Sequence, residues 1–363
     1  MKIITILGAR PQFIKAAALS NAIESHNQVD GNKHIEEILV HTGQHFDANM
    51  SDVFFEELGI KKPKYNLSIS GGNHGEMTGK MLIEVEKVLL EEKPDWVLIY
   101  GDTNSTLAGA LAASKLHIKV AHVEAGLRSF NMKMPEEVNR ILSDNVSSLL
   151  FCPTNVAVEN LAKEGITNGV CNVGDVMFDV TLHYQNIAKE KVTLEQFDVS
   201  EKGYILSTVH RAENTNCPER LSNIIKALAE IAKTTDVVLP LHPRTRNIIE
   251  SQGLEEQLGN IKIIEPISYL EMLRLEMSAQ LVLTDSGGVQ KEAYFNYAPC
   301  VTMRDETEWV ETIEIGANEL VGADYGAIIA AVKRAQAKDI SSLEQVYGDG
   351  KASQKIIDEL LNY

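Results

Sequence analysis

The sequence predicts an α/β protein built from two similar α/β domains that face each other across a cleft. Strand-like runs alternate with helical segments from one end of the 363-residue chain to the other. A more polar interval over residues 189–202 interrupts this alternation, which then starts again. Repeated βαβ units require parallel sheets covered by helices on both faces, and this length suffices for two cores. Two sets of units therefore indicate two domains.

Each expected strand is a short apolar run, and the helices between them are longer and more polar. In the first half the expected strands cover residues 3–7, 37–41, 96–100, 120–123, 149–152 and 170–173. Helices are expected over residues 104–115, 136–145 and 155–163, among others. In the second half the expected strands cover residues 204–209, 237–241, 261–264, 281–284 and 300–303. Ligands of such sheets bind beyond the carboxyl ends of the strands, so the residues that follow each strand are the candidates for a site.

The formal net charge of −17 argues against a nucleic-acid groove and against an anionic membrane surface. A phosphorylated ligand must then be held locally, by helix ends and a few placed cations. Four cysteines are scattered without a CxxC pair, which favours free thiols in a reducing compartment: Cys152, Cys171, Cys217 and Cys300. Residues 1 and 2 lead directly into the first strand, without a secretory signal or a bilayer-long apolar run, so we expect a cytoplasmic protein.

Residues 281–293 (LVLTDSGGVQKEA) combine a strand, a turn and a helix start. Ser286 suits a helix N-cap, and Gly287 and Gly288 allow the backbone to approach a bound group closely. Free N–H groups and the positive helix end would then form an anion cradle suited to a phosphate. An ordinary strand–turn–helix joint is the competing interpretation. Glu292, in the first turns of the helix, would hold ribose hydroxyls or simply favour the helix dipole.

Three strand ends of the first half carry polar candidates. The first strand is followed by GARPQ, in which Arg10 suits a phosphate or carboxylate partner, and the next helix carries Lys15. Asp102 follows another strand, as a catalytic carboxylate or, more commonly for such a residue, as an N-cap. Glu124 ends a strand that otherwise has a buried pattern, which is costly unless the acid is paired or functional.

Residues 135–140 (PEEVNR) have the pattern of a helix start, with proline first and acids behind it. Glu136 and Arg140 are spaced to form an i,i+4 ion pair. In the second half, His210 and His242 each end a strand and have arginine neighbours. Two such histidines at one rim of a sheet favour anion binding over two structural histidines.

Several enzyme classes lack support in the sequence. No GxGxxG follows the first strand, which counts against a nicotinamide enzyme. Neither HExxH nor a Cys/His cluster suggests zinc. Residues 72–80 resemble a phosphate-binding loop but have His74 where the motif requires glycine.

Taken together, six motifs in this order resemble the non-hydrolysing UDP-N-acetylglucosamine 2-epimerase family over nearly the whole chain. They are GARPQ (residues 8–12), GDT (101–103), HVEAGLR (122–128), PEEVNR (135–140), HR (210–211) and DSGGVQKE (285–292). The resemblance implies a GT-B fold of two Rossmann-like domains, of which the second binds UDP and the first faces the sugar. It implies that residues 353–361 form a helix that returns to the first domain. We therefore expect one domain over residues 1–174 and 350–363 and the other over residues 175–349. The resemblance also implies a homodimer that uses neither nicotinamide nor metal.

The reaction implied by the resemblance is anti elimination of UDP to a 2-acetamidoglucal, followed by protonation of the opposite face and return of UDP. It needs carboxylates near the ring and a cationic clamp on the departing diphosphate. Asp102, Glu124 and Glu136 correspond to the family's catalytic acids, and His210 corresponds to its essential histidine. Asp102 or Glu124 would handle the C2 proton, Glu136 would support the ring or act from its other face, and His210 with Arg10 would stabilise the leaving phosphate. Arg10, Lys15, Arg140, His242, Ser286, Gly287, Gly288 and Glu292 are the expected substrate-binding residues.

Two departures from the family pattern affect the expected sugar. The family commonly has GTRPE where this chain has GARPQ, and ERPE where this chain has EWVE at residues 308–311. An arginine usually credited with ligand contact is therefore replaced by Trp309. Both changes are similar to the branch that acts on UDP-2,3-diacetamido-2,3-dideoxyglucuronic acid. Gln44 and His45 resemble part of the region where bacterial members bind an activating UDP-sugar.

Three other functions remain open at this point. A GT-B glycosyltransferase would share the architecture and the nucleotide cradle. A hydrolysing epimerase would release N-acetylmannosamine and UDP. A non-catalytic UDP-sugar sensor would bind the ligand alone, but the carboxylates at the strand ends argue against it.

Overall fold

All strands of the described chain run parallel to their neighbours, in two separate sheets. The computed structural model describes residues 1–44, 55 and 59–363. It divides into unit 1, which comprises Met1–Val180 and Gln345–Tyr363, and unit 2, which comprises Thr181–Glu344. Each unit alternates strands with helices, as the sequence predicts.

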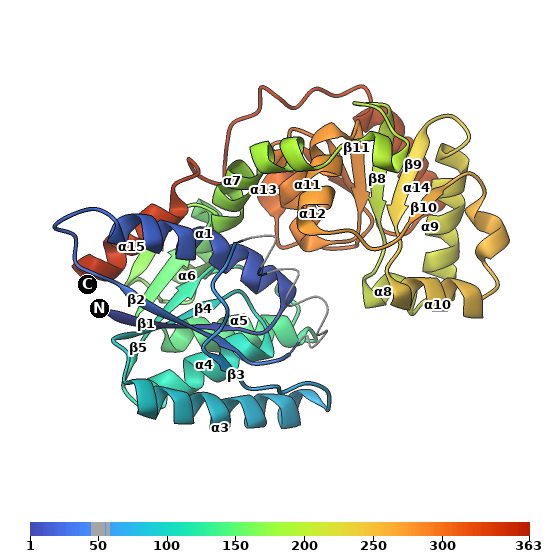
Figure 1. The fold of residues 1–363 in the computed structure, drawn as a ribbon. Helices are drawn as coiled ribbons and strands as arrows, with labels where there is room; N and C mark the ends of the chain where they lie inside the picture. Colours follow the sequence, from blue (N-terminus) through green and yellow to red (C-terminus); the bar gives the residue numbers. More distant parts are fainter. Residues whose placement is uncertain (45–54, 56–58) are drawn as a thin grey trace. The chain divides into compact units, whose positions relative to one another are not determined.

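Unit 1 contains a seven-stranded sheet in the order β3-β2-β1-β4-β5-β6-β7. Its strands are β1 (Lys2–Leu7), β2 (Glu36–His41), β3 (Tyr65–Asn66), β4 (Trp96–Tyr100), β5 (Lys119–Val123), β6 (Leu149–Cys152) and β7 (Val170–Asn172). Its helices are α1 (Arg10–Asn27), α3 (His74–Glu92), α4 (Asn104–Lys115), α5 (Pro135–Val146), α6 (Asn155–Lys163), the start of α7 (Val176–Lys191) and α15 (Ala352–Asn362). Figure 1 shows α1 and α15 on one side of this sheet and α3 and α4 on the other.

Unit 2 contains a six-stranded sheet in the order β10-β9-β8-β11-β12-β13. Its strands are β8 (Tyr204–Thr208), β9 (Asp236–Pro240), β10 (Lys262–Ile264), β11 (Leu281–Thr284), β12 (Cys300–Thr302) and β13 (Asn318–Leu320). Its helices after α7 are α8 (Ala212–Thr215), α9 (Pro218–Ile231), α10 (Pro243–Ser251), α11 (Tyr269–Ser278), α12 (Gly287–Phe295), α13 (Val310–Glu314) and α14 (Tyr325–Ala335), with short 3₁₀ turns at Glu195–Phe197 and Glu255–Leu258.

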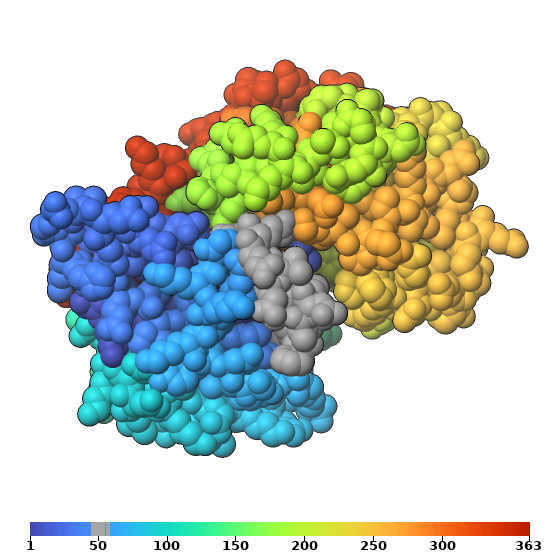
Figure 2. All heavy atoms as spheres, in the orientation of Figure 1, coloured from blue at the N-terminus to red at the C-terminus, as the bar shows by residue number. Residues whose placement is uncertain are grey.

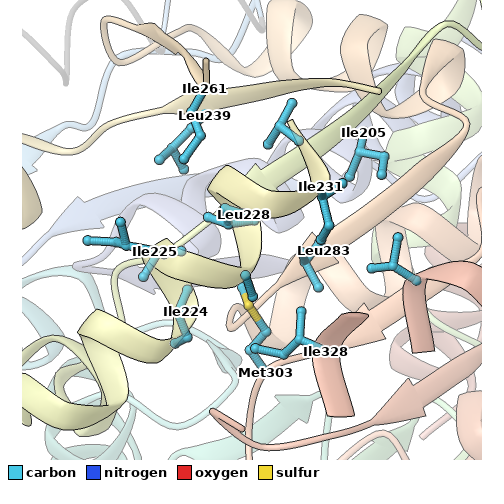
Figure 3. Packing of buried hydrophobic residues seen from close by; sticks show 14 of the residues in the cluster. Ile205, Ile224, Ile225, Leu228, Ile231, Leu239, Ile261, Leu283, Met303 and Ile328 are labelled. Carbon is cyan, nitrogen blue, oxygen red and sulfur yellow. The ribbon is translucent and has the colours of Figure 1, made fainter. Parts of the chain in front are cut away.

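The core of unit 2 follows from the spacing of apolar residues in α9. Leu221, Ile224, Ile225, Leu228 and Ile231 recur at helical spacing and are buried against the sheet. Figure 3 shows this packing, in which the α9 side chains meet strand residues of β8, β9 and β11. The polar face of α9 stays in water, so the helix covers the sheet without needing a further layer.

The core of unit 1 depends on small residues in α4. A Cβ on Gly109 would lie 3.1 Å from Cγ2 of Ile99 and 3.2 Å from Cγ1 of Ile6, so a larger residue would push the helix off β1 and β4. Alanines of α4 complete the contact with the sheet. The close approach fixes the start of α4 beside the ends of these two strands.

The last helix, α15, belongs to unit 1 and packs on α1. The carboxylate of Asp179 in α7 accepts hydrogen bonds from the amides of Ala352 (3.0 Å) and Ser353 (2.7 Å), and so caps this helix. At its end the Tyr363 ring meets the Trp96 ring edge-on at 5.4 Å. The last residues of the chain are thus fixed to the first sheet.

The strand order reverses once in each sheet. From β1 the chain adds β2 and β3 on one side and β4 onward on the other; from β8 it adds β9 and β10 on one side and β11 onward on the other. Helices diverge at such reversal points and leave a crevice at the carboxyl ends of the two central strands. Each unit therefore has one favoured site, after β1 and β4 in unit 1 and after β8 and β11 in unit 2.

No helix in the described part of the chain combines the length and hydrophobicity needed to cross a membrane. Within the same residues, no three His, Cys, Asp or Glu side chains are grouped to hold a metal ion.

Candidate functional site

Glu124 lies directly after β5 in unit 1 and has an unusual backbone. Its φ is +70°, and its side chain is only 5% exposed. Holding a non-glycine residue in this left-handed region costs about 1–3 kcal/mol of conformational free energy, and residues held in this way concentrate at functional sites. Its carboxylate Oε2 is ion-paired with Nζ of Lys15, which α1 carries from the end of β1. Two predicted site residues from different elements thus meet at the reversal point of unit 1.

Asp102 follows β4 and is held by an arginine. Its Oδ2 accepts hydrogen bonds from Nε (3.1 Å) and Nη2 (3.0 Å) of Arg140, whose side chain is 4% exposed. Nη1 of Arg140 donates to Oε2 of Glu137 at 2.6 Å. The helical partner of Arg140 is therefore Glu137 at i,i+3, rather than Glu136 at i,i+4 as the sequence suggested. The guanidinium fits between two carboxylates and orients the Asp102 side chain, which keeps 35% exposure.

Glu137 is a site residue that the sequence analysis missed. Burial favours a raised pKa for its carboxyl group, but hydrogen bonds from the Ser129 and Phe130 amides and from Arg140 outweigh burial and lower it. Glu137 is therefore ionised at neutral pH, and it joins the loop before α5 to Arg140. Glu136 occupies the first turn of α5, one residue earlier, and is partly exposed.

Arg10 is the first residue of α1 and is partly exposed at the same end of the sheet. Gln12, two residues later, connects the loops that follow β1 and β4. Its Oε1 accepts from the amides of Gly8 (2.8 Å) and Ala9 (3.0 Å), and its Nε2 donates to the Tyr100 carbonyl (2.8 Å). This buried amide holds the two strand ends in a fixed relation.

Of the two residues considered for allosteric binding, Gln44 has an internal role in this structure. Its Oε1 accepts from the Ser105 amide (3.1 Å) and hydroxyl (2.8 Å) at the start of α4. His45 lies outside the described residues.

A buried polar network supports the ends of β4 and β5. The ring nitrogens of His122 lie 2.7 Å from Oδ1 of Asp144 and 2.7 Å from the Gly101 carbonyl oxygen. Nη1 of Arg128 donates to the other Asp144 oxygen at 2.8 Å, and its remaining nitrogens bind Glu164. Burial alone would raise the pKa of Asp144, but His122 and Arg128 lower it. The network connects β5 to α5 and holds the carbonyl group of Gly101, the residue directly before Asp102.

In unit 2, the loop after β8 wraps around a buried carboxylate. Oδ2 of Asp285 accepts from the amides of His210 and Arg211, both at 3.0 Å, and Oδ1 lies 3.4 Å from Nδ1 of His210. The half-exposed His210 ring loses part of its hydration, which lowers its pKa; Arg211, His242 and Arg244 act in the same direction, and Asp285 opposes them. A neutral His210 at pH 7 can donate one N–H to an anion without adding charge.

His242 begins α10 as its N-cap, where its Nδ1 accepts from the Arg244 amide at 3.2 Å. Nη2 of Arg244 donates to Oδ1 of Asn216 at 2.9 Å. His242 therefore caps α10 in the loop after β9, and it also contributes to the lowered pKa of His210.

The predicted anion cradle has the expected local form. Ser286 is the N-cap of α12, but its side chain makes no capping hydrogen bond, and its amide donates to Thr284 Oγ1 at 2.9 Å. Gly287 follows in a crowded place: a Cβ there would lie 2.6 Å from Oε1 of Glu308 and 3.4 Å from Nε1 of Trp309. A Cβ here would displace the end of the Glu308 side chain, whereas glycine lets the amides of the first turn of α12 stay close to the groups around them.

Charged groups surround this helix start. Arg211 Nη2 lies 4.0 Å from Glu308 Oε1, and Nη1 of the buried Arg304 lies 3.1 Å from Glu308 Oε2. Nζ of Lys291, in α12, lies 3.6 Å from the centre of the Trp309 ring. Residues 304–309, after β12, form a wall beside the cradle, of which the sequence analysis named only the part that belongs to residues 308–311.

Glu292 lies in α12 with 9% exposure, and its Oε2 would be 3.9 Å from a Cβ on Gly288. Behind it, in α11, Glu276 is 1% exposed. Burial raises the pKa of Glu276 well above its ordinary value, and the nearby Glu292 raises it further. Nδ2 of Asn296 donates to Oε2 of Glu276 at 3.3 Å and to the Glu292 carbonyl at 2.8 Å, so it connects the two acids.

Glu276→Gln is expected to make the stability of the protein less dependent on pH. A raised pKa means that the protonated acid stabilises the fold fully below the ordinary value of 4.5, and that this contribution is lost as the pH rises through the raised value. The variant cannot lose a proton, so its unfolding midpoint should exceed that of the parent by a margin that grows above pH 4.5. Urea unfolding from pH 4 to 9 measures this margin. The exposed Glu250→Gln serves as control, and a constant margin would contradict the assignment.

Comparison with known proteins supplies the deciding observation. The family model described as UDP-N-acetylglucosamine 2-epimerase matches residues 27–361. The chain belongs to the UDP-N-acetylglucosamine 2-epimerase family. The resemblance seen in the motifs is thereby confirmed.

Two relatives of this epimerase family match the chain over nearly its whole length. UDP-2,3-diacetamido-2,3-dideoxy-D-glucuronate 2-epimerase of Pseudomonas aeruginosa is 56% identical over 99% of both chains. UDP-N-acetylglucosamine 2-epimerase of Methanocaldococcus jannaschii is 48% identical over 100% of this chain and 99% of its own. The crystal structure of the M. jannaschii enzyme in complex with UDP-GlcNAc and UDP matches with a TM-score of 0.91, 47% identity and full coverage of both chains. The structure of the Neisseria meningitidis enzyme bound to UDP-GlcNAc matches with a TM-score of 0.89, 33% identity and the same coverage.

These matches also confirm the fold class, because the epimerases in this comparison have the two Rossmann-like units of the GT-B type. Unit 1 brings Arg10, Lys15, Asp102 and Glu124 to one end of its sheet. Unit 2 brings Ser286, Gly287, Gly288 and Glu292 to the start of α12, and its loop after β8 carries His210.

Proposed function

We propose that this chain is a non-hydrolysing UDP-sugar 2-epimerase that interconverts UDP-N-acetylglucosamine and UDP-N-acetylmannosamine. Membership of the epimerase family gives the reaction class. The observation that carries the assignment to residues is Glu124, an enclosed acid with a left-handed backbone, paired with Lys15 where the strand order of unit 1 reverses.

Unit 2 binds UDP. The uncapped amides at the start of α12 and the guanidinium of Arg211 donate hydrogen bonds to the diphosphate, and the Glu292 carboxylate accepts hydrogen bonds from the ribose hydroxyls. His210 donates a hydrogen bond to the phosphate that leaves, and the bound anion raises the proton affinity of its ring. Arg10 assists from unit 1. The UDP then stays bound while its bond to the sugar is broken.

The carboxylates of unit 1 act on the sugar. Breaking the C1–O bond places positive charge at C1, so the C2 hydrogen becomes acidic enough for Asp102 or Glu124 to remove it as the C1–C2 double bond forms. Glu136 stabilises the ring or returns a proton from the opposite face. Arg140 orients the Asp102 carboxylate, and Lys15 orients the Glu124 carboxylate. UDP then adds back to C1 of the protonated intermediate and gives the C2 epimer.

A second candidate substrate is UDP-2,3-diacetamido-2,3-dideoxyglucuronic acid. The Pseudomonas relative named for that sugar is 56% identical, and Gln12 and Trp309 stand where the family pattern has glutamate and arginine. Trp309 borders the start of α12, so this difference changes the wall beside the cradle.

The test is NMR of each UDP-sugar incubated with the enzyme in D2O. Deuterium at C2 together with the manno epimer supports the proposal, and the faster of the two donors identifies the substrate. Free sugar would instead indicate a hydrolysing epimerase. Absence of reaction with both donors would leave a glycosyltransferase or a sensor.

The proposal includes a cytoplasmic homodimer. Ile83 and Leu90 are 58% and 56% exposed and lie seven residues apart, hence on one face of α3. This helix lies on the surface of unit 1 (light blue in Figure 2). The four cysteines form no disulfide, as in proteins of a reducing compartment. Light scattering of the parent and of Ile83→Glu tests the dimer, since an unchanged mass for the variant would exclude this face.

A further inference from the structure

Phe130 has a backbone conformation that its side chain disfavours. Its φ is +59°, in the left-handed region that bulky residues rarely adopt. Lys93 and Tyr297 share this conformation, but they follow the ends of α3 and α12, where a left-handed residue terminates a helix. Phe130 precedes a helix instead. Glycine or asparagine would fit this position with less strain.

Within the described residues, the strain brings little burial of the Phe130 side chain. The Phe130 side chain is 76% exposed, so it contributes little to the core of unit 1. The strained backbone of Phe130 is costly for folding, and residues held in such conformations cluster at active sites and ligand contacts.

The loop holds Phe130 rigidly and connects it to the proposed acid–base residues. Its amide donates to Oε1 of Glu137 at 2.8 Å, and the Ser129 amide donates to Oε2 at 3.0 Å. The same Oε2 accepts from Arg140 at 2.6 Å, and Arg140 binds Asp102 at 3.0 Å. One carboxylate thus fixes both the aromatic residue and the arginine that orients Asp102. Phe130 also lies six residues before Glu136, in the loop that begins α5.

The reaction creates a need for such a residue. When the C1–O bond breaks, the sugar becomes a neutral 2-acetamidoglucal that is no longer attached to the diphosphate. The cradle in unit 2 then holds UDP alone, so contacts with the sugar itself must retain the intermediate. Its C–H groups and acetamido methyl are apolar and suit the face of an aromatic ring.

We propose that Phe130 covers the sugar during the reaction and retains the unsaturated intermediate until UDP adds back. This inference rests on the proposed function. Without the ring, elimination still breaks the C1–O and C2–H bonds and forms the C1–C2 double bond, with the C2 proton passing to the carboxylate. The products, 2-acetamidoglucal and UDP, then leave before readdition.

The test compares Phe130→Gly, Phe130→Asn and Phe130→Tyr with the parent. Gly and Asn relieve the backbone strain and remove the aromatic ring, whereas Tyr keeps both. For Gly and Asn we expect an unchanged or higher unfolding midpoint, unchanged UDP affinity, and at least a tenfold rise in the ratio of released 2-acetamidoglucal to epimer. Tyr should behave as the parent. Met132→Ala, a change of another exposed residue of the loop, is the matched control.

NMR of the same reaction mixtures gives both products, and calorimetry gives UDP affinity. An unchanged product ratio in the Gly and Asn variants overturns the inference and leaves the epimerase assignment intact. A lower unfolding midpoint in both variants shows a structural role and also overturns it. If the parent itself forms no epimer from either donor, the proposed function fails, and this inference fails with it.

Discussion

Glu124→Gln is expected to lower kcat by about 10²- to 10⁴-fold while the enzyme still binds UDP. Gln keeps the shape of the side chain but cannot take a proton from C2. Apart from Arg10, the proposed UDP-binding groups belong to unit 2, so the affinity for the nucleotide should not depend on this change. Initial rates of epimer formation and calorimetry with UDP measure the two quantities separately.

Asp102→Asn should likewise lower kcat and leave UDP binding unchanged, because Arg140 can still donate to the amide oxygen and keep the side chain in place. Glu164→Gln is the matched control, since Glu164 binds Arg128 at the outer end of the buried network and touches none of the proposed acid–base residues. A parent-like rate in either the Glu124 or the Asp102 variant would remove that residue from the mechanism. Loss of both turnover and UDP binding would indicate a folding defect instead.

Asp144→Ala is expected to destabilise unit 1 by about 3–5 kcal/mol, because it leaves His122 and Arg128 buried beside an empty space. That loss corresponds to a fall of about 10 °C in the unfolding midpoint of a unit of this size. Differential scanning calorimetry measures it, and UDP should still stabilise unit 2.

Glu164→Ala removes the partly exposed partner of the same arginine and should cost about 1 kcal/mol or less, since water replaces part of the interaction. Equal losses of stability in the two variants would mean that Asp144 is not the main stabilising residue of the network.

The local pattern of the sequence was enough to predict the larger strands and several helices. Expected residues 96–100, 104–115 and 155–163 coincide with β4, α4 and α6, because apolar runs and caps are local signals. β3 and β13 were missed, since β3 has only two residues and β13 reads Asn-Glu-Leu, so neither forms an apolar run. The position of the candidate site could be predicted because parallel strands place their carboxyl ends at one edge of the sheet. Asp102 and Glu124 each follow a strand, so they lie at the same edge whatever the loops do.

Partners distant in sequence could not be predicted in this way. Glu136 and Glu137 are equally good candidates to pair with Arg140 from spacing alone, and the choice depends on which face of α5 is buried against the loop. Asp144 lies 22 residues after His122, and only packing of α5 on the sheet joins them. The wall at residues 304–309 depends likewise on how the segment after β12 folds over Gly287.

The link that Gln12 makes between the ends of β1 and β4 contains no ionisable group. Its amide nitrogen donates to the Tyr100 carbonyl, a bond that an ionised carboxylate at this position could not make. A change of pH therefore does not alter the charge of this link. A bell-shaped rate profile would accordingly describe proton transfer at the sugar, and not the loosening of this part of the scaffold.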